Sequence, residues 1–124
     1  MTTYSAPTRD MRFVIEELAG LGQINALPQY EDASLDLVDA VLEEAARLAG
    51  EVLAPLNKTG DQEGARIVDG EVKAVTGFAD AYRQFVDGGW NGIAFSPEHD
   101  GQGLPALVGT AVQEMWQSAN MAFA

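Results

Sequence analysis

From Ser34 to Leu53 the sequence carries an apolar residue every three or four positions, with acidic residues between them. The apolar positions are Leu35, Val38, Val41, Leu42, Ala45, Leu48, Ala49 and Val52. This period predicts a long amphipathic helix, which is stable in water only when its apolar side packs against other elements. Asp32 or Ser34 is expected to cap its first amides, and Pro55 is expected to end it. The rest of the chain must therefore cover this helix.

Three further segments have the same period. Residues 10–20 are expected to form a short helix capped by Asp10, and residues 77–87 a second one that ends at a pair of glycines. A last helix is predicted over 104–124, with Pro105 in its first turn. Because no glycine, proline or basic residue stops this helix, the sequence is expected to be truncated inside it.

The segments between these helices are rich in turn-forming residues. Loops are expected over 23–32, 57–64 and 90–103. Residues 65–75 predict two short strands around Asp69-Gly70, a dipeptide that favours a tight hairpin turn. The sequence thus predicts a mainly α fold: one domain, a helical bundle of about four principal helices with a minor β-hairpin.

Charge and composition narrow the classes of partner. The net charge is −12, from 19 acidic and 7 basic residues, and such a surface repels nucleic acid and anionic membranes. The absence of cysteine excludes disulfides and thiolate ligands and is typical of a reducing cytoplasm. No segment resembles a signal peptide or a membrane span. We therefore expect a soluble, cytoplasmic protein.

Gly101, Gly103 and Ala106 imitate a dinucleotide-binding fingerprint, because they have the G-x-G-x-x-A spacing before a predicted helix. A Rossmann unit also needs a strand before this loop and a second strand after the helix. The sequence predicts neither strand. A structural turn is therefore favoured over a nucleotide-binding module.

Other polar candidates have structural interpretations. His99 is the only histidine, and no nucleophile or ligand accompanies it in the sequence. Glu16-Glu17 and Glu43-Glu44 are neighbours in predicted helices, so their side chains diverge on the polar side. The sequence therefore predicts no catalytic, cofactor-binding or metal-binding residue.

Aromatic residues lie along one side of the third predicted helix. Phe78, Tyr82 and Phe85 have the spacing of a core face, and Trp90 follows them. Trp90 and Pro97 are expected to brace the loop over 90–103, the glycine-rich loop, rather than to contact a ligand.

Residues 89–105 read Gly-Trp-Asn-Gly-Ile-Ala-Phe-Ser-Pro-Glu-His-Asp-Gly-Gln-Gly-Leu-Pro. This stretch resembles the signature that precedes the fourth helix in the acyl-CoA dehydrogenase family, with Asp100 where the pattern has glycine. Residues 4–13 and 54–61 are similar to the methylthiopropanoyl-CoA dehydrogenase-like branch of that family. The resemblance covers essentially the whole chain.

The resemblance implies an enzyme larger than this chain. Members have an amino-terminal helical domain, a middle β-domain and a carboxy-terminal bundle, and FAD binds between the last two. A glutamate of the carboxy-terminal bundle removes the α-proton of the acyl-CoA while the flavin accepts the β-hydride. The chain is thus expected to be the amino-terminal domain (1–124) of an FAD-dependent oxidoreductase of fatty acid metabolism, and to be inactive alone.

The same resemblance assigns substrate-binding residues. In the family, the corresponding part of the fourth helix lines the acyl pocket, which implies that Asn120, Met121 and Ala124 contact substrate. They are expected on one face of the helix. The alternative is that all three are ordinary packing residues.

Two partner hypotheses remain. The isolated domain is expected to self-associate, because Met115, Trp116, Met121 and Phe123 should be left uncovered where the missing domains would pack. Alternatively, the chain is a complete, small acidic helical domain without enzymatic activity, which binds a partner protein through the apolar flank of its last helix.

Overall fold

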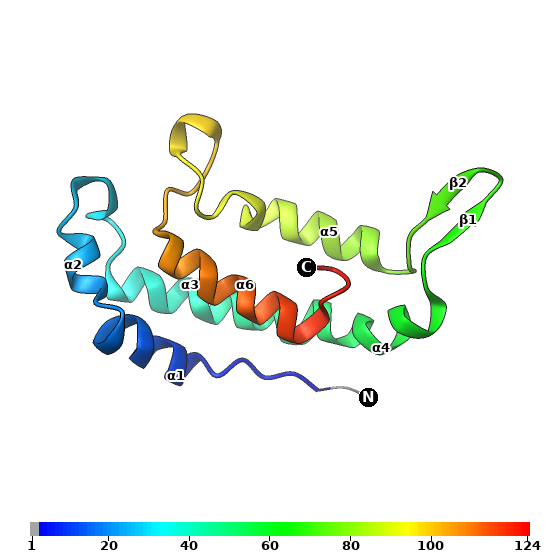
Figure 1. Ribbon diagram of the computed structural model, residues 1–124, viewed down its shortest axis with the longest axis horizontal. Helices are drawn as coiled ribbons and strands as arrows, with labels where there is room; N and C mark the ends of the chain where they lie inside the picture. Colours follow the sequence, from blue (N-terminus) through cyan, green and yellow to red (C-terminus); the bar gives the residue numbers. More distant parts are fainter. Residues whose placement is uncertain (1–2) are drawn as a thin grey trace.

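The computed structural model describes residues 3–124, and most of them lie in helices (Figure 1). In chain order the elements are α1 (Thr8–Phe13), a π turn (Val14–Leu18), α2 (Leu21–Asn25), a 3-10 turn (Pro28–Tyr30), α3 (Leu35–Leu48), a second π turn (Ala49–Leu53), α4 (Ala54–Glu63), β1 (Arg66–Val68), β2 (Glu71–Lys73), α5 (Phe78–Asp87), two 3-10 turns (Trp90–Gly92 and Pro97–His99) and α6 (Ala106–Asn120). The mainly α fold with a minor β-hairpin is confirmed. No helix among the described residues has the length and apolar character that crossing a bilayer requires.

Helix α6 lies at the centre of the helical body, where it packs against α3 and the second π turn (Figure 1). Met115 is completely buried, and Trp116 is 2% exposed. The ring of Trp116 meets those of Phe85 and Trp90 edge to face, with centroids 5.8 and 5.3 Å apart. The expectation that Met115 and Trp116 would be uncovered is therefore wrong, because α3, α5 and the following loop enclose them.

The aromatic face of α5 is only partly buried. Phe85 packs on Trp116, and Phe78 packs on Phe123 with ring centroids 5.8 Å apart. Tyr82 stacks on Phe85 but is exposed to solvent, so its assignment to the core is wrong. The helical spacing identified the side of α5 that carries aromatic rings, but the edge of that side faces water.

The amino-terminal region differs from the sequence expectation. The first helix begins at Thr8, and Asp10 lies within it rather than capping it. Gly20 ends this helical region with a positive φ of 75°, as expected. Residues 23–25, expected to be loop, belong to α2, because Leu21 is inserted into the core and anchors this short helix.

Helix α3 begins where the sequence predicts, because the Ser34 Oγ accepts a hydrogen bond from the Leu37 amide at 3.2 Å. The prediction that Pro55 ends this helix is wrong. In the second π turn the Ala54 amide donates to the Ala49 carbonyl, and α4 follows with Pro55 in its first turn. Since the π turn leads directly into α4, Pro55 lies inside a continuous helix, which lacks one backbone hydrogen bond there because proline has no amide hydrogen.

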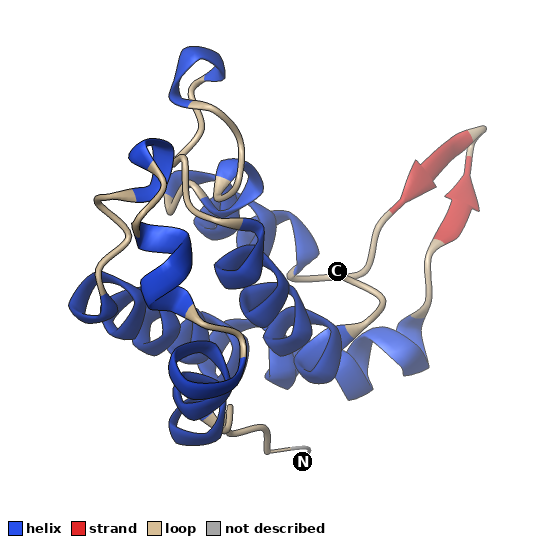
Figure 2. Cartoon of the chain, turned by 60° about the vertical axis from the view of Figure 1, so that its left-hand side comes forward, coloured by secondary structure: helices blue, strands red, loops and turns tan. Residues whose placement is uncertain are grey.

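The predicted hairpin is confirmed. Strands β1 and β2 pair antiparallel with Ile67 opposite Val72, and the turn consists of Asp69 and Gly70 with φ of 53° and 79°. Figures 1 and 2 show the hairpin extending away from the helical body, beyond the end of α4. Each of its strand residues is exposed.

The boundaries of the last two helices follow local signals only in part. Helix α5 lies between Gly77 and Gly88, close to the predicted bounds. Helix α6 was expected to continue to the last residue, but it ends at Asn120. The Asn120 side chain accepts a hydrogen bond from the Phe123 amide, at 3.2 Å, and so turns the chain at this point.

Candidate functional site

The end of α6 carries the three residues that the sequence assigns to substrate binding. Asn120 is 1% exposed, and its Nδ2 donates to the Leu53 carbonyl at 3.1 Å. Its Oδ1 accepts from the Phe123 amide, so both polar groups of the side chain are paired within the chain. Asn120 therefore fixes the end of α6 against the second π turn.

Met121 and Ala124 have a different environment. Met121 is 74% exposed, and Ala124 is also exposed. The expected common face does not form, because consecutive helical positions point about 100° apart and the helix ends at Asn120. Of the three residues, Met121 is the one with a large side chain accessible from outside.

A cleft of about 700 Å³ lies beside Met121, at the base of the hairpin. It is lined by Asn57, Gly60, Asp61, Gly64, Ala65, Ala74, Val75, Phe78, Met121 and Ala122. The absence of a side chain at Gly60 lets Phe78 pack closely on α4, since a Cβ there would lie 3.3 Å from the Phe78 ring. The apolar lining of the cleft suits an aliphatic group, and its one carboxylate, Asp61, lies at the exposed edge.

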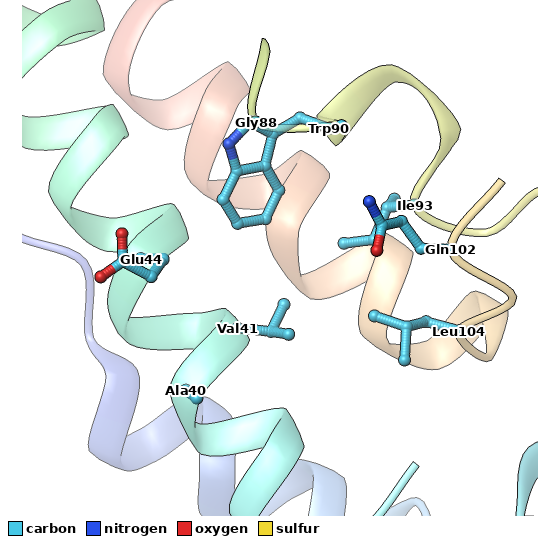
Figure 3. A pocket seen from close by; sticks show the side chains of 9 residues that line it. Ala40, Val41, Glu44, Gly88, Trp90, Ile93, Gln102 and Leu104 are labelled. Atoms are coloured by element: carbon cyan, nitrogen blue, oxygen red, sulfur yellow. The ribbon is translucent and has the colours of Figure 1, made fainter. Parts of the chain in front are cut away.

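A second hollow, of about 340 Å³, lies between α3 and the glycine-rich loop. Figure 3 shows the Trp90 indole reaching into it from the loop, with Val41 facing it from α3 and Ile93 and Leu104 beside it. Glu44 contributes the only acidic side chain of the lining. Trp90 is half-buried here and packs on Trp116, as expected of a residue that braces the loop.

The glycine-rich loop itself folds back on its own carbonyl groups. The amides of Gly101, Gln102 and Gly103 donate to the carbonyls of Ser96, Gly92 and Phe95 at 3.1, 2.9 and 2.9 Å. These amides are therefore not available for a phosphate. The structural turn favoured from the sequence is confirmed.

Two positions of the loop depend on its backbone geometry. Asp100 has φ 60° and ψ 22°, the left-handed conformation that glycine adopts readily and aspartate tolerates. A Cβ at Gly101 would overlap the Phe95 carbonyl oxygen and lie 2.6 Å from the Phe95 Cβ. Pro97 is exposed but lies against Gly103, where an added Cβ would be 3.1 Å from the Pro97 Cγ.

The remaining polar candidates of the sequence lie on the surface. His99 and the pairs Glu16-Glu17 and Glu43-Glu44 are exposed. Within residues 3–124, no three His, Asp or Glu side chains are grouped so that they could hold a metal ion. Burial raises the pKa of the Tyr4 phenol, but this residue belongs to the amino-terminal segment that lies along Gly50, away from both hollows.

Comparison with known proteins identifies relatives for nearly all of the chain. It is 47% identical over 121 residues to 3-methylmercaptopropionyl-CoA dehydrogenase of Ruegeria pomeroyi. This match covers 98% of the chain and 21% of the relative. Two butyryl-CoA dehydrogenases of Syntrophomonas wolfei are 27% and 31% identical over 94% and 69% of the chain, and the matches cover 20% and 15% of those proteins. No family model matches. The chain is therefore similar to acyl-CoA dehydrogenases over nearly all of its own length, and it spans about a fifth or less of the length of these relatives.

Proposed function

We propose that this chain is the amino-terminal helical domain of a flavin-dependent acyl-CoA dehydrogenase. The observation that carries the proposal is the 47% identity to 3-methylmercaptopropionyl-CoA dehydrogenase over 98% of the chain. The match includes every helix of the chain, whereas a short motif shared by unrelated proteins would match only one segment. The parent enzyme would oxidise an acyl-CoA thioester between its α and β carbons with FAD as electron acceptor.

The domain would contribute part of the acyl pocket at the end of α6. Met121 lies beside the apolar cleft that also contains Val75 and Phe78, so an acyl chain placed there would contact carbon and sulfur atoms rather than charges. Asn120 would act indirectly, since its hydrogen bond to Leu53 holds the end of α6 in place. Ala124 follows Met121 on the chain and would extend the same wall.

The proposal places the flavin site outside this chain. A flavin pyrophosphate needs several free donors, and the amides of the glycine-rich loop are occupied by loop carbonyls. The paired carboxylates Glu16-Glu17 and Glu43-Glu44 lie exposed on helix surfaces, without the burial that tunes a catalytic base. FAD and the catalytic base would therefore come with other domains of the parent enzyme, which would also be its partners.

We expect the isolated chain to be colourless and to show no acyl-CoA oxidation. A mixture with FAD should leave the fluorescence of the flavin unchanged, and an artificial electron acceptor should not be reduced when butyryl-CoA or a longer ester is added. Saturable flavin binding at micromolar concentration, or turnover that a single substitution abolishes, would show that these residues contain a site of their own.

The domain assignment has a separate test in the gene. The proposal expects the reading frame to continue beyond the codon for Ala124 into a β-domain and a second helical bundle. A stop codon directly after Ala124 would contradict it and would favour the alternative, a complete acidic helical domain that binds another protein. This test does not depend on the behaviour of the isolated chain.

A further inference from the structure

The hairpin carries two large apolar side chains that nothing in the described chain covers. Ile67 is 77% exposed and Val72 is 73% exposed, and the strand register places them directly opposite each other. Cross-strand partners point to the same face, so the two side chains form one apolar patch. Figure 2 shows the hairpin clear of the helices.

The outer edge of β2 is also unpaired among the described residues, because this strand pairs with β1 alone. In a two-residue hairpin, the residues that flank the turn, Val68 and Glu71, exchange backbone hydrogen bonds. The next residue of β2, Val72, therefore directs its N–H and C=O away from β1. An edge of this kind is a template for another strand.

The charges of the hairpin indicate which strand would fit. The register places Arg66 opposite Lys73, a like-charged pair that destabilises an isolated hairpin. Lys73 is paired along its own strand with Glu71 at 2.7 Å. The sequence Glu71-Val72-Lys73 is complementary to itself when two copies run antiparallel, since each glutamate then faces the lysine of the other copy.

We propose that the β2 edge is an interface between two copies of this chain, which pair antiparallel about Val72. The result is a four-stranded sheet in which Ile67 and Val72 of both copies form one continuous apolar strip. Pairing through two β1 edges would place Arg66 opposite Val68 and neutralise no charge. Pairing of β1 with the β2 of a second copy in the register of the hairpin would repeat the repulsion between Arg66 and Lys73. The β2 edge is therefore the favoured contact.

Cross-linking tests this geometry directly, because the chain contains no cysteine of its own. In the proposed dimer the two copies of residue 72 form a hydrogen-bonded pair with Cα atoms about 5.5 Å apart, which suits a disulfide. Under mild oxidation at tens of micromolar protein, Val72→Cys should form a covalent dimer. Ile67→Cys is the matched control: it is equally exposed on the same face, but its two copies would lie about 14 Å apart across three strand spacings. We expect at least about tenfold slower dimer formation for Ile67→Cys, and equal rates would overturn the proposal.

Charge reversal separates pairing from changes within one hairpin. In the Val72→Cys chain, Glu71→Lys and Lys73→Glu each place like charges across the proposed interface, and each should slow cross-linking about tenfold. A mixture of the two variant chains restores both opposite-charge contacts, although the pair within each hairpin is still lost. The mixture should therefore form heterodimers at nearly the original rate. Heterodimers that form no faster than either homodimer would contradict the proposed interface.

Discussion

Replacing Trp116 with alanine is expected to lower the free energy of unfolding by about 3–5 kcal/mol. Its side chain is 2% exposed and packs edge to face against Phe85 and Trp90, so its removal leaves a large cavity between α5, α6 and the glycine-rich loop. The neighbouring rings would also lose their contact with the indole, which adds to the loss of buried area.

Urea unfolding followed by circular dichroism measures this loss as a shift of the midpoint at constant slope. Tyr82→Ala is the matched control, because Tyr82 lies on the same aromatic side of α5 but is exposed. It should cost less than about 1 kcal/mol. A Trp116→Ala variant that is destabilised no more than Tyr82→Ala would show that α6 is not enclosed in this way.

Replacing Gly101 with alanine is expected to cost about 3 kcal/mol or more, although the change adds only one methyl group. The new Cβ would overlap the carbonyl oxygen of Phe95. Because that oxygen belongs to the backbone and accepts the Gly103 amide at 2.9 Å, it cannot move without breaking the turn. Both the loop and the start of α6 should therefore be disturbed.

Gly22→Ala provides the control for this substitution. Gly22 lies within α2, and a Cβ there would meet nothing within 4 Å. Alanine should therefore stabilise α2 by up to about 1 kcal/mol, through its higher helix propensity. The two variants should thus shift the urea midpoint in opposite directions. A Gly101→Ala chain as stable as the wild type would show that the loop does not pack as described.

The elements that the sequence predicts well are those specified by nearby residues. The Ser34 cap is a contact over three positions, and the Asp69-Gly70 turn is set by two residues that tolerate positive φ. The continuation of the helix through Pro55 was not predicted, because proline normally ends a helix and the sequence carries no signature of the π turn that precedes it. The short helix α2 was missed because burial of Leu21, rather than local propensity, stabilises it.

The candidate site was less predictable because its properties depend on distant segments. The glycine spacing in the loop imitates a nucleotide-binding fingerprint, but the lack of predicted flanking strands favoured a turn, and the turn is present. The role of Asn120 could not be read from its neighbours, since its hydrogen-bond partner, Leu53, is far away in the chain. Likewise, whether Trp116 is covered depends on the path of α5 and not on the pattern of α6.

The second π turn, Ala49–Leu53, has a consequence for α4 and the hairpin beyond it. A π turn contains one residue more than the α turn it replaces. It therefore has the effect of inserting one residue into the helix. The extra residue determines how the side chains of α4 are rotated around the helix axis relative to those of α3. Without it, every side chain of α4 would be rotated by about 100° around the helix axis. The direction in which the hairpin leaves the helical body thus depends partly on the number of residues in the π turn. Deleting one residue there would alter this direction even if no core side chain were changed.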